Sequence, residues 1–303
     1  MSTQAKSRPT KFTIRRSTGE RVFEAFNITI LISLGFVCLF PFINSFANAF
    51  SSDAAIAAGR VTLIPVDVQT EAMTSVLMNT AVLRSLMVTI FITVVGTSIN
   101  LFLTVITAYP LARRDLKGRK IIIQLIVFTM LFKGGMIPLY LVVRSLGLLN
   151  STWSVILPTA IITFNLLVMK TFFQNVPWEL QEAAMIEGAG NTRILFSIIV
   201  PLSVPAIVTI MLFYMVNHWN SFFSAMLYID DPSIYPLQIK LRELLLLGTY
   251  EELLEGRDAG VARVNEESLK AATVVFATIP ILVVYPWLQK YFVKGAMIGA
   301  VKG

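Results

Sequence analysis

Residues that could take part in chemistry are few in this sequence. The chain has one His and one Cys, and its long apolar runs contain no carboxylate, with Lys133 and His218 as the only basic residues there. These residues cannot form a metal-ligand cluster, a Cys–His pair or an acid–base dyad. The phosphate-binding pattern G-x4-G-K-[ST] is also missing. We therefore expect neither an enzyme nor a metal site, and any energy must come from a partner.

The composition places the chain in a lipid bilayer. Of its 303 residues, 55% are hydrophobic and 14% are charged, which is typical of a polytopic membrane protein. A bilayer core about 30 Å thick requires about 20 apolar residues for each helical crossing. Six runs of suitable length occur, at Phe26–Ile43, Ser85–Ala112, Ile121–Val143, Ser145–Met169, Ile194–Ile229 and Ala271–Gln289. The sequence predicts an all-α membrane protein with six transmembrane helices.

Two of these runs need comment. The fifth is too long for one crossing, so we expect Pro201 and Pro205 to mark its start and His218–Ile229 to form a bent or re-entrant segment beyond it. The first is followed by Ala47-Asn48-Ala49, which resembles a signal-peptidase site. Because this run is long enough to cross the bilayer, we expect an uncleaved anchor.

Lys and Arg residues predict the orientation. They concentrate in residues 1–25, in the loop after the second run and in residues 290–303, which share one side if six helices alternate. Positive charge favours the cytoplasm, so both termini are expected there. Residues 26–289 then form one transmembrane domain, with a cytoplasmic loop at 174–197 and an outer acidic loop at 230–270. The cations flank apolar runs without interleaved aromatic residues, so nucleic acid is not an expected partner.

The cytoplasmic loop has the signals of a short helix, a turn and a second helix. Asn175 can cap the first helix and Pro177 suits its first turn. Gly188 or Gly190 can end it in a left-handed conformation, after which Asn191 or Thr192 can start the second. Its apolar residues form no clean stripe, which argues against a helix lying on lipid. A docking helix and an ordinary connecting helix both remain possible.

The same loop resembles the signature loop of ABC importer permeases, E-A-A, x3, G, x9, I-x-L-P. Glu182-Ala183-Ala184, Gly188 and Ile198-Ile199-Val200-Pro201 match this pattern, with Val200 in place of Leu. The segments Asn217–Asn220 and Gly299–Gly303 further resemble the smaller permease of maltose-type carbohydrate importers. The resemblance implies a type I ABC importer permease fold in a bacterial or archaeal cell membrane.

The resemblance also implies partners and roles. The partners are a second homologous permease, two ATPase subunits that carry ATP and Mg²⁺, an outer solute-binding protein and a carbohydrate. The residues implied in ATPase coupling are Glu182, Ala183, Ala184, Gly188, Ala189 and Pro201. Glu182 would pair with a basic group of the ATPase or cap neighbouring backbone. Gly299, Val301, Lys302 and Gly303 would contact the ATPases, the alternative being a frayed terminus.

Polar and aromatic residues near the end of the fifth run are candidates for the substrate path. They are Tyr214, Asn217, His218, Trp219, Asn220, Phe222 and Phe223. Aromatic faces can stack on sugar rings and amides can hydrogen-bond hydroxyl groups. The alternative is an interfacial belt of aromatic residues, which is common in membrane helices.

Lys133 precedes Gly134-Gly135-Met136-Ile137-Pro138, a sequence that indicates local unwinding of a membrane helix. This bend could face the translocation cavity, or Lys133 could extend to the outer interface. With Arg84 and Arg144 it could favour an anionic sugar. The alternatives to a carbohydrate permease are a permease for another solute, such as glycerol phosphate, and an ion-coupled secondary transporter, which the lack of intramembrane acids disfavours.

Overall fold

The computed structural model describes residues 17–132, 134–246 and 265–300. Within these residues all regular structure is helical, which confirms the all-α prediction. The expected sites Lys133, Val301, Lys302 and Gly303 lie outside the described residues.

Three helices are individually long and apolar enough to cross a membrane: α1 (Thr18–Ala49), α4 (Thr80–Ala112) and α16 (Glu266–Ala300), the last over residues 266–286. Local capping sets where the first two begin. The Ser17 hydroxyl accepts a hydrogen bond from the Glu20 N–H (3.2 Å), and the Glu20 carboxylate accepts one from the Ser17 N–H (2.7 Å). The Asn79 side chain accepts from the Val82 N–H at the start of α4.

Three further candidate spans are bent pairs of helical segments. The first joins α5 (Arg119–Leu131) to α6 (Met136–Ser145) at 111°. The second joins α7 (Trp153–Ile156) and η1 (Leu157–Thr159) to α8 (Thr163–Gln174) at 50°. The third joins α10 (Asn191–Ile194), the π-helix η2 (Leu195–Ile199) and α11 (Val200–Leu202) to α12 (Val204–Trp219) at 84°. Counting each pair as one span gives the six expected spans.

Short helices occupy the connections. They are α2 (Asp53–Ala57), α3 (Glu71–Met78), α9 (Trp178–Ile186), α13 (Phe222–Tyr228), η3 (Pro232–Ile234) and α14 (Leu237–Leu246). The expected bend after His218 is present, because α12 ends at Trp219 and α13 starts a separate segment. Helix α14 lies within residues 230–270, the expected outer loop, and α16 continues through residues 290–300 of the expected tail. The domain bounds stay a prediction.

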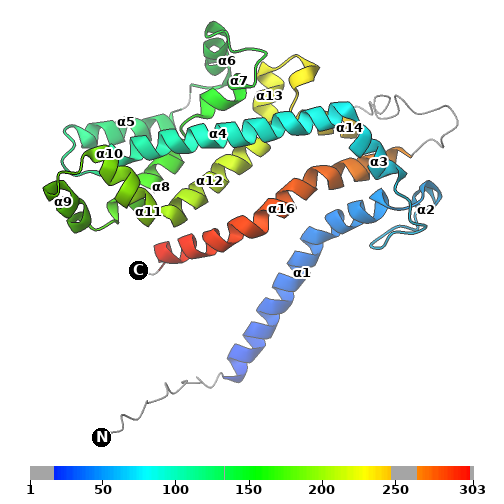
Figure 1. Ribbon diagram of the computed structural model, residues 1–303. Helices are drawn as coiled ribbons and strands as arrows, with labels where there is room; N and C mark the ends of the chain where they lie inside the picture. The colour runs from blue at the N-terminus through cyan, green and yellow to red at the C-terminus, as the bar shows by residue number, and fades with distance from the viewer. Residues whose placement is uncertain (1–16, 133, 247–264, 301–303) are drawn as a thin grey trace, which may run out of the picture.

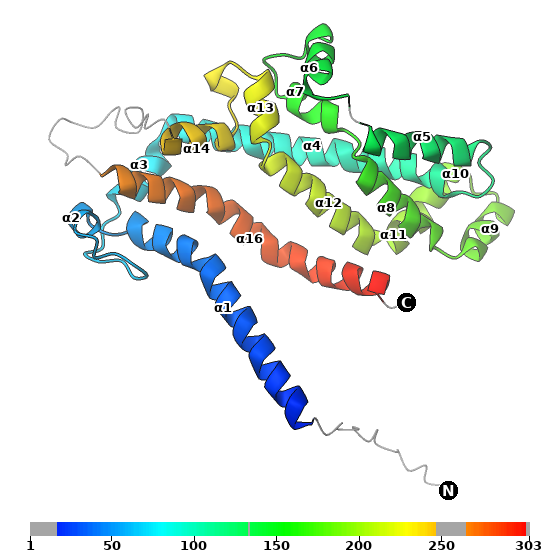
Figure 2. The same ribbon diagram turned by 180° about the vertical axis from the view of Figure 1, so that it is seen from behind.

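The central helix of the bundle is α4, which packs against α8 and α12 (Figure 1). Helix α12 also packs against α16, and α16 in turn packs against α1. Figure 2 shows α1 diverging from the rest towards the N-terminus, and the most apolar stretch of this helix is not buried within the chain. A surface of this kind has to be covered by lipid or by another membrane subunit.

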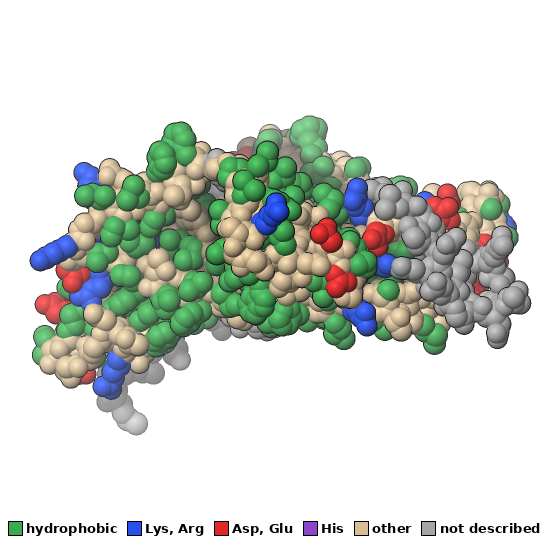
Figure 3. All heavy atoms as spheres, turned by 90° about the horizontal axis from the view of Figure 1, so that it is seen from above, with side chains coloured by type: hydrophobic (Ala, Val, Ile, Leu, Met, Phe, Trp, Pro, Cys, Tyr) green, Lys and Arg blue, Asp and Glu red, His purple; other side chains and the backbone are tan. Residues whose placement is uncertain are grey.

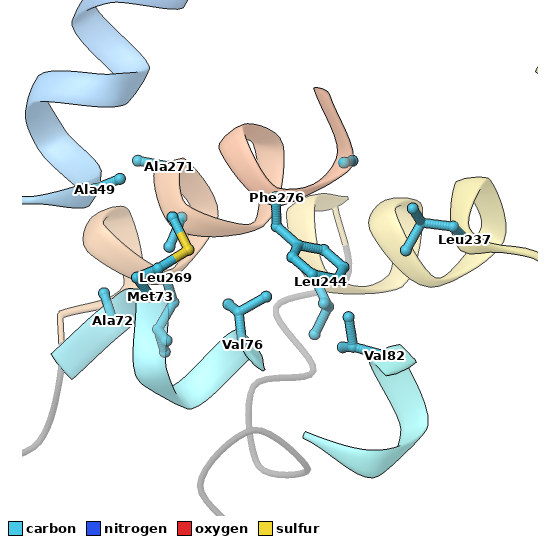
Figure 4. Close-up of a cluster of buried hydrophobic side chains, with 12 residues drawn as sticks. Ala49, Ala72, Met73, Val76, Val82, Leu237, Leu244, Leu269, Ala271 and Phe276 are labelled. Carbon is cyan, nitrogen blue, oxygen red and sulfur yellow. The ribbon is translucent and has the colours of Figure 1, made fainter. Parts of the chain in front are cut away.

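Two hydrophobic clusters close the ends of the bundle. Figure 4 shows the first, in which Met73 and Val76 of α3 meet Leu244 of α14 and Leu269 and Phe276 of α16. The second lies at the other end and joins α4, α8, η2 and α12 through Val105, Leu166, Leu195, Ile199 and Ile210. The segment that contains α9 is attached to this second cluster.

Candidate functional site

The helix α9 and its turn form the first candidate site. Helix α9 starts after Pro177, with Glu179 in its first turn, where a carboxylate favours the helix dipole. Gly188 ends it at φ +83°, and the Gly188 and Ala189 N–H groups donate to the Met185 and Ala184 carbonyls at 3.0 and 2.9 Å. This is a Schellman turn, which satisfies carbonyls that the helix end would leave open. The helix, glycine turn and second helix expected from the sequence are all present, but Asn175 ends α8 instead of capping α9, whose N-cap is Pro177.

One face of α9 is attached and the other is free. Gln181 is buried, and Ala184, Met185 and Ala189 pack against the second cluster. Glu182 and Ala183 are exposed on the same helix, and the Ile186 side chain is 83% exposed. Figure 3 shows Lys, Arg, Asp and Glu side chains at the end of the molecule that carries α9, as well as near its middle and at the opposite end. An exposed isoleucine on a charged surface is what a protein-docking element would present.

Pro201, the last residue of the signature pattern, lies in α11 directly after the π-helix. The chain bends by 84° between this segment and α12, whose second residue is Pro205. A proline removes a hydrogen-bond donor and clashes with the preceding turn, so the two prolines account for this bend. The bend directs the chain from α9 and its glycine turn into the membrane helix α12.

The second candidate site is a cavity of about 940 Å³ at the α5–α6 break. It is lined by the break itself, by the η1–α8 break and by α13. Aromatic rings come from Phe132, Phe164, Phe223 and Tyr228, and hydroxyl groups from residues such as Ser224. None of its described lining residues carries a charged side chain. These groups can stack on and hydrogen-bond a polar ring, but they offer no acid or base for catalysis.

Most of the sequence candidates near residue 214 do not line this cavity. Tyr214 is fully buried in the bundle, and its hydroxyl lies 2.7 Å from the Thr104 hydroxyl and accepts a hydrogen bond from the Ile162 N–H. Trp219 packs against the first cluster and Phe222 against a third around Ile92, while Asn217 and Asn220 are exposed elsewhere. His218 is buried with Asn100. Of the seven candidates, only Phe223 is in the lining.

The sequence reasoning missed the other aromatic residues of the cavity, although it singled out the unwound segment. Gly134, Gly135 and Pro138 line this cavity. That the cavity belongs to the translocation path stays a prediction. Lys133, between Phe132 and Gly134, lies outside the described residues. Arg84 and Arg144 are exposed and are not lining residues. Gly299 lies in the last turn of α16.

Comparisons with known proteins agree with this architecture. Residues 120–297 match the model of a family described as "Binding-protein-dependent transport system inner membrane component". The chain is 43% identical over 288 residues to the polygalacturonan/rhamnogalacturonan transport system permease protein YtcP of Bacillus subtilis, covering 93% of this chain and 99% of that protein. It is 45% identical to protein LplC of the same organism, over 96% and 98% of the two chains.

A solved structure has the same fold. It is a crystal structure of a bacterial ABC transporter involved in the import of the acidic polysaccharide alginate. The TM-score is 0.84 with 33% sequence identity, over 92% of this chain and all of the matched chain. The helices and breaks described above are therefore arranged as in a permease chain.

Proposed function

This chain belongs to the family of binding-protein-dependent transport system inner membrane components, and from that premise we propose that it forms half of the translocation path of an ATP-driven importer of acidic oligosaccharides. The chain is a multi-pass membrane permease subunit. Its partners in the proposal are a second homologous permease, two ATPase subunits and an outer solute-binding protein. ATP and Mg²⁺ bind the ATPases, and both termini of this chain face the cytoplasm.

The observation that carries the proposal is the exposed face of α9. A short helix fixed by a Schellman turn, with Ile186 83% exposed, is a rigid projection on a charged end of the molecule. Docked in an ATPase, it would move as a unit when ATP closes the ATPase pair. Its inner face packs on the cluster of α4, α8 and α12, so the motion reaches the membrane helices. The membrane helices then expose the cavity alternately to the two sides.

The acidic substrate class rests on the relatives. YtcP is named for polygalacturonan and rhamnogalacturonan, and the matched crystal structure belongs to an alginate importer. Both names refer to acidic polysaccharides. The aromatic and hydroxyl lining of the cavity suits sugar rings, and Lys133 adjoins two of the lining residues in sequence. Neither glycerol phosphate nor ion-coupled transport gains support from these relatives.

A reconstituted system tests the proposal. Copurification with this chain should recover two ATPases and one other permease. In proteoliposomes, uptake of short oligogalacturonides should require ATP and the solute-binding protein, and should exceed uptake of neutral maltooligosaccharides. Transport by the purified chain alone, without ATP, would overturn the importer mechanism. Preference for neutral sugars would overturn the acidic substrate.

A further inference from the structure

The side chain of Arg113 lies where the central helix, α4, meets the docking element, by which we mean α9, its glycine turn and the start of α10 (residues 178–191). Helix α4 ends at Ala112, and the Arg113 N–H closes its last turn on the Pro110 carbonyl at 3.2 Å. The Arg113 side chain is only 15% exposed, although it belongs to a connecting loop. It enters a cavity of about 830 Å³ whose lining also includes Tyr109 of α4 and Trp178 of α9. In the sequence, Arg113 is one of the cations of the loop after the second apolar run.

A carboxylate holds the guanidinium in a fixed orientation. The Arg113 Nε and Nη2 donate to the two carboxylate oxygens of Asp115 at 2.9 and 2.7 Å. This bidentate geometry is the pairing that the planar guanidinium fork favours. The hydrogen bond from Arg113 lowers the pKa of Asp115, so the carboxylate stays charged at neutral pH.

The rest of the guanidinium contacts both ends of the docking element. The Nη1 group donates to Asn191 Oδ1, and lies 3.5 Å from the Tyr109 hydroxyl. The Cζ atom lies 5.7 Å from the centroid of the Trp178 ring, within cation–π range. Trp178 is the first residue of α9 and Asn191 the first of α10. The Arg113 side chain thus connects the end of α4 to the first residue of α9 and to the first residue of α10. These two residues flank α9 and its glycine turn.

We propose that Arg113 is a positioning residue of energy coupling, which makes the end of α4 follow α9 when the ATPases move it. The inference rests on the proposed docking of α9 to an ATPase. Because α4 packs along both α8 and α12, a displacement of the Ala112 end of α4 also moves these two membrane helices. A parallel link is weaker: Gln174 Nε2 donates to the Ala112 carbonyl at 3.3 Å. Lysine cannot reproduce this arrangement, since one ammonium cannot fork onto Asp115 and also stack on Trp178.

The test uses the whole transporter, with both permeases, the ATPases and the binding protein. The readout is the ratio of ATP hydrolysis with oligogalacturonide-loaded binding protein to basal hydrolysis, measured beside uptake. Arg113→Ala and Arg113→Lys should each lower this ratio about fivefold or more, the lower end of typical coupling effects. Asn191→Ala should lower it less, because Asp115 and Trp178 still hold the guanidinium. The matched control is Arg114→Ala, which removes the neighbouring exposed charge and should leave the ratio within about twofold.

The outcomes separate the two proposals. If the unmodified complex does not respond to the loaded binding protein, the proposed function fails. If it responds and Arg113→Ala matches Arg114→Ala, only the role of Arg113 is wrong. Recovery of the full ratio by Arg113→Lys would also overturn that role, since it would show that positive charge alone suffices. If Arg113→Ala does not copurify with the ATPases, Arg113→Lys decides by the same criteria.

Discussion

At Gly96, helix α4 leaves room for the ring of His218 on α12. A Cβ atom at this position would lie 2.6 Å from His218 Nε2 and 2.8 Å from Cε1. His218 is 1% exposed, and its Nε2 is 3.1 Å from Asn100 Nδ2, so the ring cannot move aside easily. We predict that Gly96→Ala separates α4 from α12 and costs about 1–3 kcal/mol of stability, as overpacking does. A lower melting temperature of the detergent-solubilised complex would show this.

Gly35→Ala is the control for this substitution. Gly35 also lies inside a membrane helix, α1, but a Cβ there would meet no atom within 4 Å. Alanine is the better helix former by about 0.5–1 kcal/mol, so the melting temperature should stay the same or rise. If Gly96→Ala and Gly35→Ala lower the melting temperature equally, the contact between residue 96 and the His218 ring is not the reason for glycine at position 96.

Lys133 supports a second prediction for a single residue. It lies outside the described residues, but its neighbours Phe132 and Gly134 line the larger cavity, whose other described lining residues are uncharged. Lys133→Met should lower uptake of oligogalacturonides about tenfold relative to neutral oligosaccharides, the effect of losing one charged hydrogen bond. Arg144→Met, which removes an exposed cation outside the lining, should leave this selectivity unchanged. Unchanged selectivity of Lys133→Met would remove Lys133 from substrate recognition.

Among the elements, the turn after α9 offers a clean comparison of two glycines. Gly188 has φ +83°, whereas Gly190 has φ −70°, and a Cβ meets nothing within 4 Å at either site. Gly188→Leu therefore strains only the backbone, by about 1–2 kcal/mol, and shifts the aim of α9. We predict reduced uptake and reduced substrate-stimulated ATP hydrolysis with normal membrane insertion. Gly190→Ala should behave as the unmodified protein, and Gly188→Asn should keep more activity than Gly188→Leu, since Asn tolerates this conformation.

This element could be predicted from the sequence because its signals are local. Proline at the start, glutamate in the first turn and glycine at the end each act within one helical turn of their own position. The role of Tyr214 could not be predicted in this way, because its partner Thr104 is 110 residues distant in sequence. Runs that are apolar on all sides carry little information about which face is inside.

A weaker signal for the buried face of α4 was nevertheless present. Thr89, Thr93, Thr97, Asn100 and Thr104 recur at spacings of three or four residues, and all are buried. Polar and small residues often mark helix interfaces in membranes. Their spacing would have placed this side of α4 against its neighbours. The cavity itself depends on two separate breaks in the chain and on α13, which no single run specifies.

The basic residues after α4 and the acidic residues after α13 predict how the whole molecule lies in the membrane. Arg114 and Lys117 lie at the α9 end, in the loop between α4 and α5, and Lys120 lies in the first turn of α5. At the opposite end, Asp230 and Asp231 follow α13, and their N–H groups are held by the Asn150 side chain at 3.0 and 2.8 Å. The positive-inside rule then places α9 in the cytoplasm, where the ATPases would have to be.

Labelling of single cysteines tests this orientation. The native Cys38 is exposed on α1, so the background is Cys38→Ser, into which Ser233→Cys at the acidic end or Lys117→Cys at the α9 end is introduced. Both reporter positions are exposed. In intact cells a membrane-impermeant maleimide should label Ser233→Cys but not Lys117→Cys, and permeabilisation should allow both to react. Labelling of Lys117→Cys in intact cells would place α9 outside, where it could not meet an ATPase, and would overturn the coupling roles of both α9 and Arg113.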